Sequence, residues 1–99
     1  MQVTIRKYSG QGASELVDLL EKYSSDIEKM LRSVTGFVSY TLARSGGGGF
    51  SVTICQDQTG IDESTQKAKD WVAKNGANIS VGPPEVSHGT VFLHSQIDS

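Results

Sequence analysis

The sequence predicts an α+β fold in which a four-stranded antiparallel sheet carries two helices on one face. Two amphipathic stretches, residues 14–34 and 61–75, each lie between segments with strand character, which is the first observation behind this prediction. The second is a run of four glycines, residues 46–49, which separates two strand-like segments and indicates a hairpin. The order of elements is therefore strand, helix, strand, strand, helix, strand. This order leaves the other face of the sheet to solvent or to a partner.

Size and composition predict one compact domain that spans residues 1–99. Hydrophobic residues at 36% and charged residues at 20% are typical of a globular chain. The formal charge of −2, with Lys and Arg dispersed, argues against a nucleic-acid partner and against an anionic membrane surface. Cys55 is the only cysteine, and neither a membrane span nor a signal sequence is recognisable, so we expect a cytoplasmic protein.

The first helical stretch follows a short strand at residues 2–8, in which apolar and polar side chains alternate. Ser14 is the predicted N-cap, and Gly36 is expected to end the helix with a positive φ. Large apolar side chains recur at intervals of three and four residues, which predicts one buried face along the whole helix. This face consists of Leu16, Leu20, Tyr23, Ile27, Leu31 and Val34.

The middle of the chain is predicted to form strands at residues 37–44 and 50–56. The glycine run between them would suit a phosphate if a helix followed it, but a strand follows, so we interpret it as a mobile turn. Thr59 and Gly76 are the expected N-cap and end of the second helix. The last strand is predicted at residues 86–94, after an irregular proline-containing arm.

Strand alternation assigns the side chains of the sheet to two faces. We expect the apolar set to face the helices: Val3, Ile5, Tyr40, Leu42, Val52, Ile54, Val91 and Leu93. The opposite face is expected to carry Thr4, Arg6, Tyr8, Ser39, Thr41, Thr53, Cys55, His88, Thr90, Phe92 and His94. A face rich in Thr and Ser with scattered aromatic residues suits pairing with an identical sheet, which predicts a homodimer through the open sheet face.

Several local features resemble one known family. They are a short first strand, a long helix ending in the segment Val34-Thr35-Gly36-Phe37-Val38-Ser39-Tyr40, the hairpin, and a second helix that carries Trp71. Together they resemble the dimeric α+β barrel superfamily, the ferredoxin-like fold of antibiotic-biosynthesis-monooxygenase-like domains. The resemblance implies this β-α-β-β-α-β fold over nearly the whole chain, and assembly as a dimer.

The same resemblance suggests a class of activity. Several members are cofactor-free oxygenases or haem-degrading enzymes, which use an Asn, a Trp and an Arg or His around a pocket between sheet and helices. Trp71 could match the helical Trp, but no His follows it on that helix and the first strand carries no Asn. These departures argue against haem degradation, and we expect no cofactor.

Four residues are candidates for binding a small, partly aromatic organic molecule in a pocket between the second helix and the sheet. Trp71 lies on the apolar stripe of that helix, where it either packs in the core or forms the wall of the pocket. Tyr23, Tyr40 and Asn75 are its expected hydrogen-bonding neighbours.

His88, His94 and Arg6 are the candidates for chemistry if the protein is an enzyme. The histidines titrate near neutral pH and suit proton transfer, although their alternative role is in the dimer interface. They would lie too far apart on one strand to share a metal ion, so we predict no metal site. Arg6 could clamp a ligand carboxylate or pair with an acidic residue of the partner sheet.

Two classes of function remain open from the sequence. The first is binding or transformation of a small organic molecule, with a cofactor-independent monooxygenase-like activity as its enzymatic form. The second is a non-catalytic interaction or regulatory module whose dimer presents a protein-binding surface. A well-packed space around Trp71 would favour the second class, and an open pocket there would favour the first.

Overall fold

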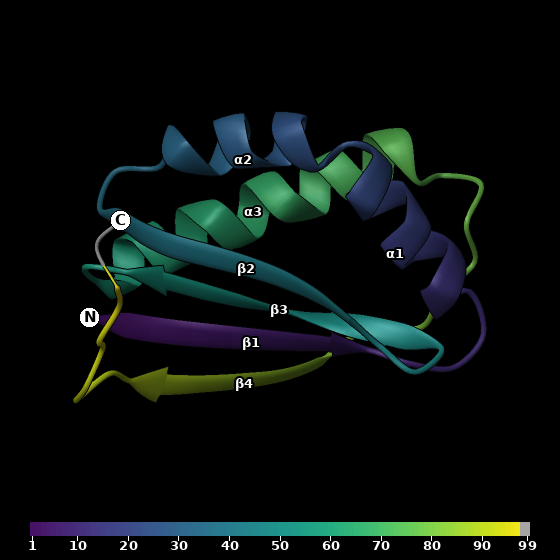
Figure 1. The fold of residues 1–99 in the computed structure, drawn as a ribbon. Coiled ribbons are helices and arrows are strands. Elements are labelled where there is room, and N and C mark those ends of the chain that lie inside the picture. The colour runs from purple at the N-terminus through teal and green to yellow at the C-terminus, as the bar shows by residue number, and fades with distance from the viewer. Residues whose placement is uncertain (98–99) are drawn as a thin grey trace.

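The structure, a computed structural model that describes residues 1–97, has the predicted α+β architecture (Figure 1). Four strands form one sheet, and every helix lies on the same side of it. In chain order the elements are β1 (Gln2–Tyr8), α1 (Ala13–Lys22), α2 (Ser24–Arg32), β2 (Phe37–Ser45), β3 (Gly48–Cys55), α3 (Gln58–Asn75) and β4 (Glu85–Thr90). Among residues 1–97, no helix has the length and apolar character needed to cross a bilayer.

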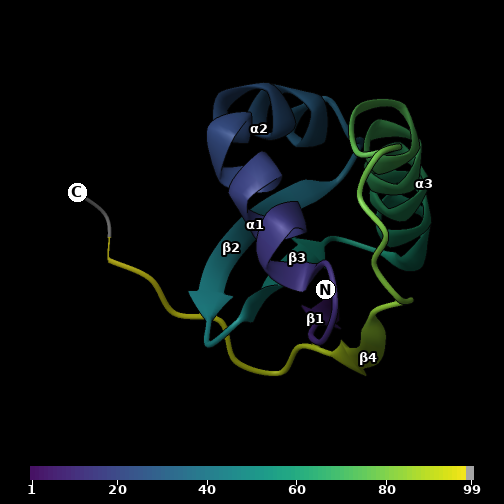
Figure 2. The same cartoon turned by 90° about the vertical axis from the view of Figure 1, so that its right-hand side faces the viewer.

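The sheet has the strand order β2-β3-β1-β4, and all neighbouring strands are antiparallel. β3 and β1 are therefore central, and β2 and β4 are the edges. Seen along the strands, α1 and α2 lie above the β2 side of the sheet and α3 lies toward the β4 side (Figure 2). The two helical groups share one core, in which Leu16, Leu20, Ile27 and Leu31 are buried.

The predicted single helix at residues 14–34 is in fact two helices that meet at Tyr23. Tyr23 leaves the helical conformation, with φ −108° and ψ 25°, and two serines follow it. Serine competes for backbone hydrogen bonds and favours helix ends, and the bend lets both short helices follow the sheet. The first helix begins at Ala13 after Gly12, so Ser14 is not its N-cap. Gly36 has the expected positive φ, of 80°.

The hairpin between β2 and β3 is tighter than the glycine run suggested. The strands continue to Ser45 and from Gly48, so only Gly46 and Gly47 form the turn. Gly48 is buried, and a Cβ there would lie 2.1 Å from the carbonyl oxygen of Tyr8. This glycine is therefore required by close backbone packing, and the turn expected over all four glycines is limited to Gly46 and Gly47.

The start of α3 and the end of β4 differ from the predicted bounds, and each difference has an identifiable reason. α3 begins at Gln58, because the side chain of Asp57, not of Thr59, accepts a hydrogen bond from the Gly60 amide at 3.0 Å. β4 ends at Thr90, which pairs with Gln2 near the start of β1, so no partner strand remains for the segment that contains His94.

The predicted faces of β1 and β3 are reversed. The polar side chains of these strands lie under the helices and are almost inaccessible: Thr4, Arg6, Ser51, Thr53 and Cys55. The apolar set lies on the open face: Val3, Ile5, Val52 and Ile54. For β2 the assignment was right, since Tyr40 and Leu42 pack against the helical core.

The reversal arises from register, which strand alternation alone does not specify. Tyr40 pairs with Thr53 and Leu42 pairs with Ser51, so large apolar residues of β2 share a face with hydroxyl residues of β3. A register shift between Phe37 and Ser39 sets this pairing. A shift by one residue exchanges every side chain between the two faces.

Candidate ligand-binding site

Arg6 is the most unusual residue of the interior. It projects from the central strand β1 toward α3 and is 7% exposed. Its guanidinium donates a hydrogen bond to the Thr65 hydroxyl, which in turn donates to the Ile61 carbonyl at 2.8 Å. Arg6 therefore links the sheet to α3, and it cannot pair with an acidic residue of a partner sheet, because it faces away from the open side.

No carboxylate of residues 1–97 forms an ion pair with Arg6. The ion pairs in this part of the chain are all at the surface and join Arg32 with Glu28, Arg44 with Asp18 and Glu21, and Lys67 with Glu63. Burial of a charge is costly unless an opposite charge or several hydrogen bonds compensate for it. The interior consequently holds a positive charge whose only side-chain partner in this region is a neutral hydroxyl.

Two tyrosines lie close to this charge. Burial raises the pKa of Tyr40 to about 12, and the hydrogen bond with Ser51 and the charge of Arg6 act in the opposite direction. Burial likewise raises the pKa of Tyr8, which the Arg6 charge again opposes. Both phenols are therefore neutral at physiological pH and can donate a hydrogen bond.

A small cavity of about 20 Å³ lies between these groups and the helices; we call it the Arg6 cavity. A space of this size holds about one water molecule. Trp71 forms one wall and packs edge-to-face on Tyr23, with ring centroids 5.9 Å apart. The cavity is lined by Arg6, Tyr8, Leu20, Ile27, Met30, Tyr40, Leu42, Ser51, Ala68, Trp71 and Val72.

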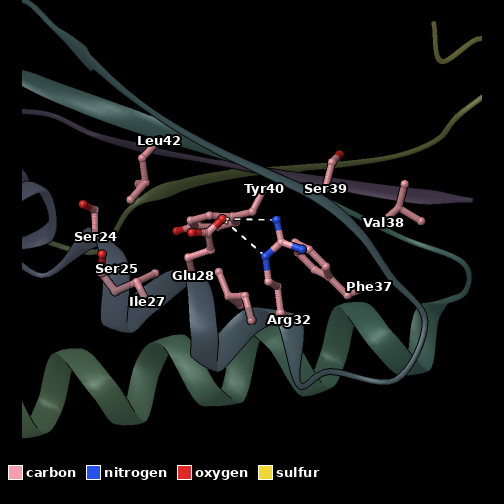
Figure 3. Close-up of a pocket in the computed structure, with 11 residues that line it drawn as sticks. Ser24, Ser25, Ile27, Glu28, Arg32, Phe37, Val38, Ser39, Tyr40 and Leu42 are labelled. Atoms are coloured by element: carbon pink, nitrogen blue, oxygen red, sulfur yellow. Dashed lines mark hydrogen bonds and ion pairs between the residues drawn. The ribbon is translucent and has the colours of Figure 1, made fainter. Parts of the chain in front are cut away.

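A much larger hollow of about 650 Å³ lies between α2 and the edge strand β2; we call it the α2–β2 groove (Figure 3). Tyr40 reaches from β2 toward Ile27 and Glu28 of α2, and the Glu28–Arg32 ion pair of 3.2 Å lies beside it. The groove is lined by Ser24, Ser25, Ile27, Glu28, Leu31, Arg32, Phe37, Val38, Ser39, Tyr40 and Leu42.

The two spaces have common walls. Ile27, Tyr40 and Leu42 line both the Arg6 cavity and the α2–β2 groove. A third hollow of about 160 Å³ beside α1 shares Tyr8 and Leu42 with the cavity. The two tyrosines thus separate the buried charge of Arg6 from two hollows that open to solvent.

The predicted ligand-binding residues divide into two groups. Trp71 and Tyr40 line the Arg6 cavity. Tyr23 does not line it, but its ring packs edge-to-face on Trp71. Asn75 does not join them: its side chain is exposed and its amide donates to the Trp71 carbonyl oxygen at 2.9 Å. This bond ties the Asn75 side chain back to the last turn of its own helix, so the side chain does not reach the Arg6 cavity.

The structure does not bring the histidines to Arg6. His88 is exposed on the edge strand β4, where its Nδ1 lies 3.0 Å from the Thr4 hydroxyl. His94 is exposed beyond the end of β4, so the expectation that both histidines lie on one strand face was wrong. Within residues 1–97 no group of three or more His, Cys, Asp or Glu is arranged to hold a metal ion.

Cys55 is fully buried at the end of β3. Burial raises the pKa of its thiol, which the hydrogen bond with Ser64 opposes. This environment keeps the thiol protonated and therefore unreactive, because the reactive species is the thiolate.

Sequence reasoning missed the residues that complete the site. Tyr8 was assigned to the open face, and Ser51 and the groove residues of α2 were not considered. The available signal was the i, i+2 spacing of Arg6 and Tyr8, which places both on one strand face. Nothing in the sequence alone relates them to Ser51, because that contact depends on strand register.

No family model and no curated protein matches the sequence. Solved structures do share the fold. A MhuD mutant with two manganese protoporphyrin IX molecules bound per active site is 21% identical, with a TM-score of 0.70 and coverage of 97% of this chain and 99% of that one. A dimeric ferredoxin-like protein from an uncultured marine organism is 11% identical, with a TM-score of 0.66 and coverage of 97% and 96%.

A third structure, a monooxygenase from the gene ActVA-Orf6 of Streptomyces coelicolor in complex with nanaomycin D, is 18% identical. Its TM-score is 0.55, and the match covers 99% of this chain and 90% of that chain. At these identities the similarity shows the fold. The chain therefore has the ferredoxin-like α+β fold found in monooxygenase-like proteins, as the sequence resemblance implied.

Proposed function

We propose that this protein binds a small, planar organic molecule in the α2–β2 groove. The observation that carries the proposal is that the groove adjoins the Arg6 cavity through Tyr40. Its volume of about 650 Å³ lies within the range of ligand sites, roughly 300–1,000 Å³. Phe37, Tyr40 and Leu42 offer apolar contacts to a flat ring, and serines and the Glu28–Arg32 ion pair also line the groove.

A cofactor-independent monooxygenase-like activity is the enzymatic form of this proposal. An oxygenation without a cofactor uses dioxygen as the oxidant: the substrate loses a proton to solvent, and its carbanion supplies the electrons that bind the oxygen. One oxygen atom then stays in the product, and the other leaves as water. Arg6, Tyr8 and Tyr40 provide a cation and two neutral donors, which would stabilise the oxyanion of such a substrate. Two structures with this fold, one named a monooxygenase, hold flat polycyclic molecules, which supports the choice of ligand shape.

We further propose that the molecule is a homodimer through the open sheet face. This face is apolar along the central strands, and Ile5 is 39% exposed on it. An identical sheet is the natural cover for such a surface. A dimeric protein of the same fold supports this assembly.

The interaction module remains the second candidate, because the space beside Trp71 is only about 20 Å³, too small by itself for an organic ligand. Such a module would need no ligand in the groove. It predicts that the dimer binds a protein partner and that small molecules leave the groove empty.

The test uses the fluorescence of Trp71, the only tryptophan, on titration with flat aromatic probes. Ser25→Arg would place a long side chain in the groove from an exposed position of α2. Ser14→Arg is the matched control, because Ser14 is an exposed serine of α1 outside the groove. We expect Ser25→Arg to weaken probe binding about tenfold or more and Ser14→Arg to leave it unchanged. Equal binding by both variants would place the ligand elsewhere, and no quenching at all would favour the interaction module.

A further inference from the structure

We infer that Arg6 is the anchor for a carboxylate on the ligand, so that the protein selects planar aromatic acids over their neutral analogues. This inference rests on the proposed function, because it assumes that the ring of the ligand occupies the α2–β2 groove. It adds the chemical class of the ligand and the residue that recognises it.

The first argument is the charge of Arg6. The guanidinium has five N–H donors, and its one side-chain acceptor in residues 1–97 is the Thr65 hydroxyl. Every fully buried side-chain nitrogen or oxygen in this part of the chain has a hydrogen-bond partner. The guanidinium nitrogens that do not bond Thr65 are therefore not sealed in the core, and the Arg6 cavity is the space that they reach.

The second argument is that the cavity supplies donors without a charged acceptor. Tyr8 and Tyr40 are neutral phenols, and the lining includes the Ser51 hydroxyl but no Asp or Glu. A planar guanidinium flanked by hydroxyl donors matches the two oxygens of a carboxylate, which accept hydrogen bonds only. A neutral ligand would leave the charge uncompensated.

The third argument is the path between groove and cavity. Tyr40 lines both spaces and is only partly buried, so rotation of its ring would join them. The cavity alone holds about one water molecule, so a carboxylate would fit beside Arg6 only once the Tyr40 ring has turned and joined the two spaces. The ring of the ligand would remain in the α2–β2 groove, which Phe37 and Tyr40 line.

The opposing interpretation is that Arg6 has only a structural role, as a link between β1 and α3 through Thr65. The variant Thr65→Val distinguishes the structural role of Arg6 from the role as a carboxylate anchor. It removes the hydroxyl that accepts a hydrogen bond from Arg6 and leaves the guanidinium at the cavity. If the link were the whole role of Arg6, loss of Thr65 and loss of Arg6 would have the same effect on ligand choice.

The experiment compares 2-naphthoate with its neutral analogue 2-naphthamide by quenching of Trp71 fluorescence. We expect the native protein to prefer the acid about tenfold or more, since a hydrogen-bonded charge pair contributes about 1.5–3 kcal/mol. Arg6→Gln should abolish this preference, Arg6→Lys should retain part of it, and Thr65→Val should retain most of it. Circular dichroism melts check that each variant is folded.

Three results would overturn the inference, and they are distinguishable. Equal affinity of the native protein for both probes would refute the carboxylate anchor and leave the groove as a ligand site. A preference that survives in Arg6→Gln would assign the recognition to another group. Absence of binding by either probe would contradict the proposed function itself, together with the inference. If Arg6→Gln does not fold, the two probes are compared on the native protein and on Thr65→Val. That comparison still shows whether the protein prefers the acid, and whether the preference is independent of the link to Thr65.

Discussion

Ile5 of β1 and Val52 of β3 are directly paired on the face of the sheet that the helices leave uncovered. The neighbouring pair of Val3 and Ile54 lies on the same face, where Ile54 is already buried, at 8% exposed. The helix-facing side of these strands carries Thr4, Arg6 and hydroxyl residues instead. The central strands thus turn apolar side chains such as Ile5 outward, which is unfavourable for an isolated chain and favourable for one that pairs with a second copy.

We expect the native protein to have twice the chain mass of 10.6 kDa in static light scattering at micromolar concentration. Ile5→Arg would bury unpaired charges on the dimer axis and should yield the monomer. Gln66→Arg, an exposed position on α3 behind the sheet, is the matched control and should remain dimeric. An intact Ile5→Arg dimer would mean that the subunits associate through another surface.

Tyr40 should make stability sensitive to alkaline pH. Burial raises its pKa from 10.0 to about 12. The folded chain then holds the phenol proton more tightly than the unfolded chain. The contribution of Tyr40 to the free energy of unfolding should therefore be constant below pH 10. As the pH rises toward 12, the free energy of unfolding should fall by up to about 2 kcal/mol.

The measurement is urea unfolding between pH 9 and about pH 12, with Tyr40→Phe as the control. The phenylalanine variant removes this titration, so its stability should decline less steeply over the same range. Parallel curves for the native protein and the variant would show that the Tyr40 hydroxyl is exposed to water.

Gly48→Ala should be strongly destabilising. The new Cβ would lie 2.1 Å from the Tyr8 carbonyl oxygen and 3.2 Å from Cβ of Ala13, so β3 and β1 or α1 would have to separate. We expect a loss of roughly 2–3 kcal/mol in urea unfolding. Gly47→Ala is the matched control in the same hairpin, because nothing lies within 4 Å of a Cβ there. Equal stabilities of the two variants would contradict the close packing of Gly48.

The predictable part of the fold is the part that depends on local pattern. The order of strands and helices, the positive φ of Gly36 and the end of α3 at Gly76 all follow from periodicity and from terminal glycines. The break at Tyr23 was missed because the apolar stripe continues through it, since both α1 and α2 pack on one core.

The candidate site was predicted in fragments. Arg6, Tyr40 and Trp71 were selected for their chemistry, and the structure places all three around one cavity. Their grouping was not predictable, because Arg6 had been assigned to the wrong face of the sheet. Asn75 was included for its position on the helix, but its side-chain amide donates to the Trp71 carbonyl oxygen of the same helix.

The sequence by itself determined the class of fold, because helical and strand periodicity are properties of neighbouring residues. It also determined that Arg6 and Tyr8 share a face of β1, since side chains two apart on a strand point the same way. Only the tertiary structure decided which face that is. The pairing of Ser51 with Arg6 and of Leu42 with Ser51 joins segments far apart in the chain, and no local pattern specifies such a register. The helices consequently cover the polar face of the central strands, where Arg6 is buried without a carboxylate partner from residues 1–97.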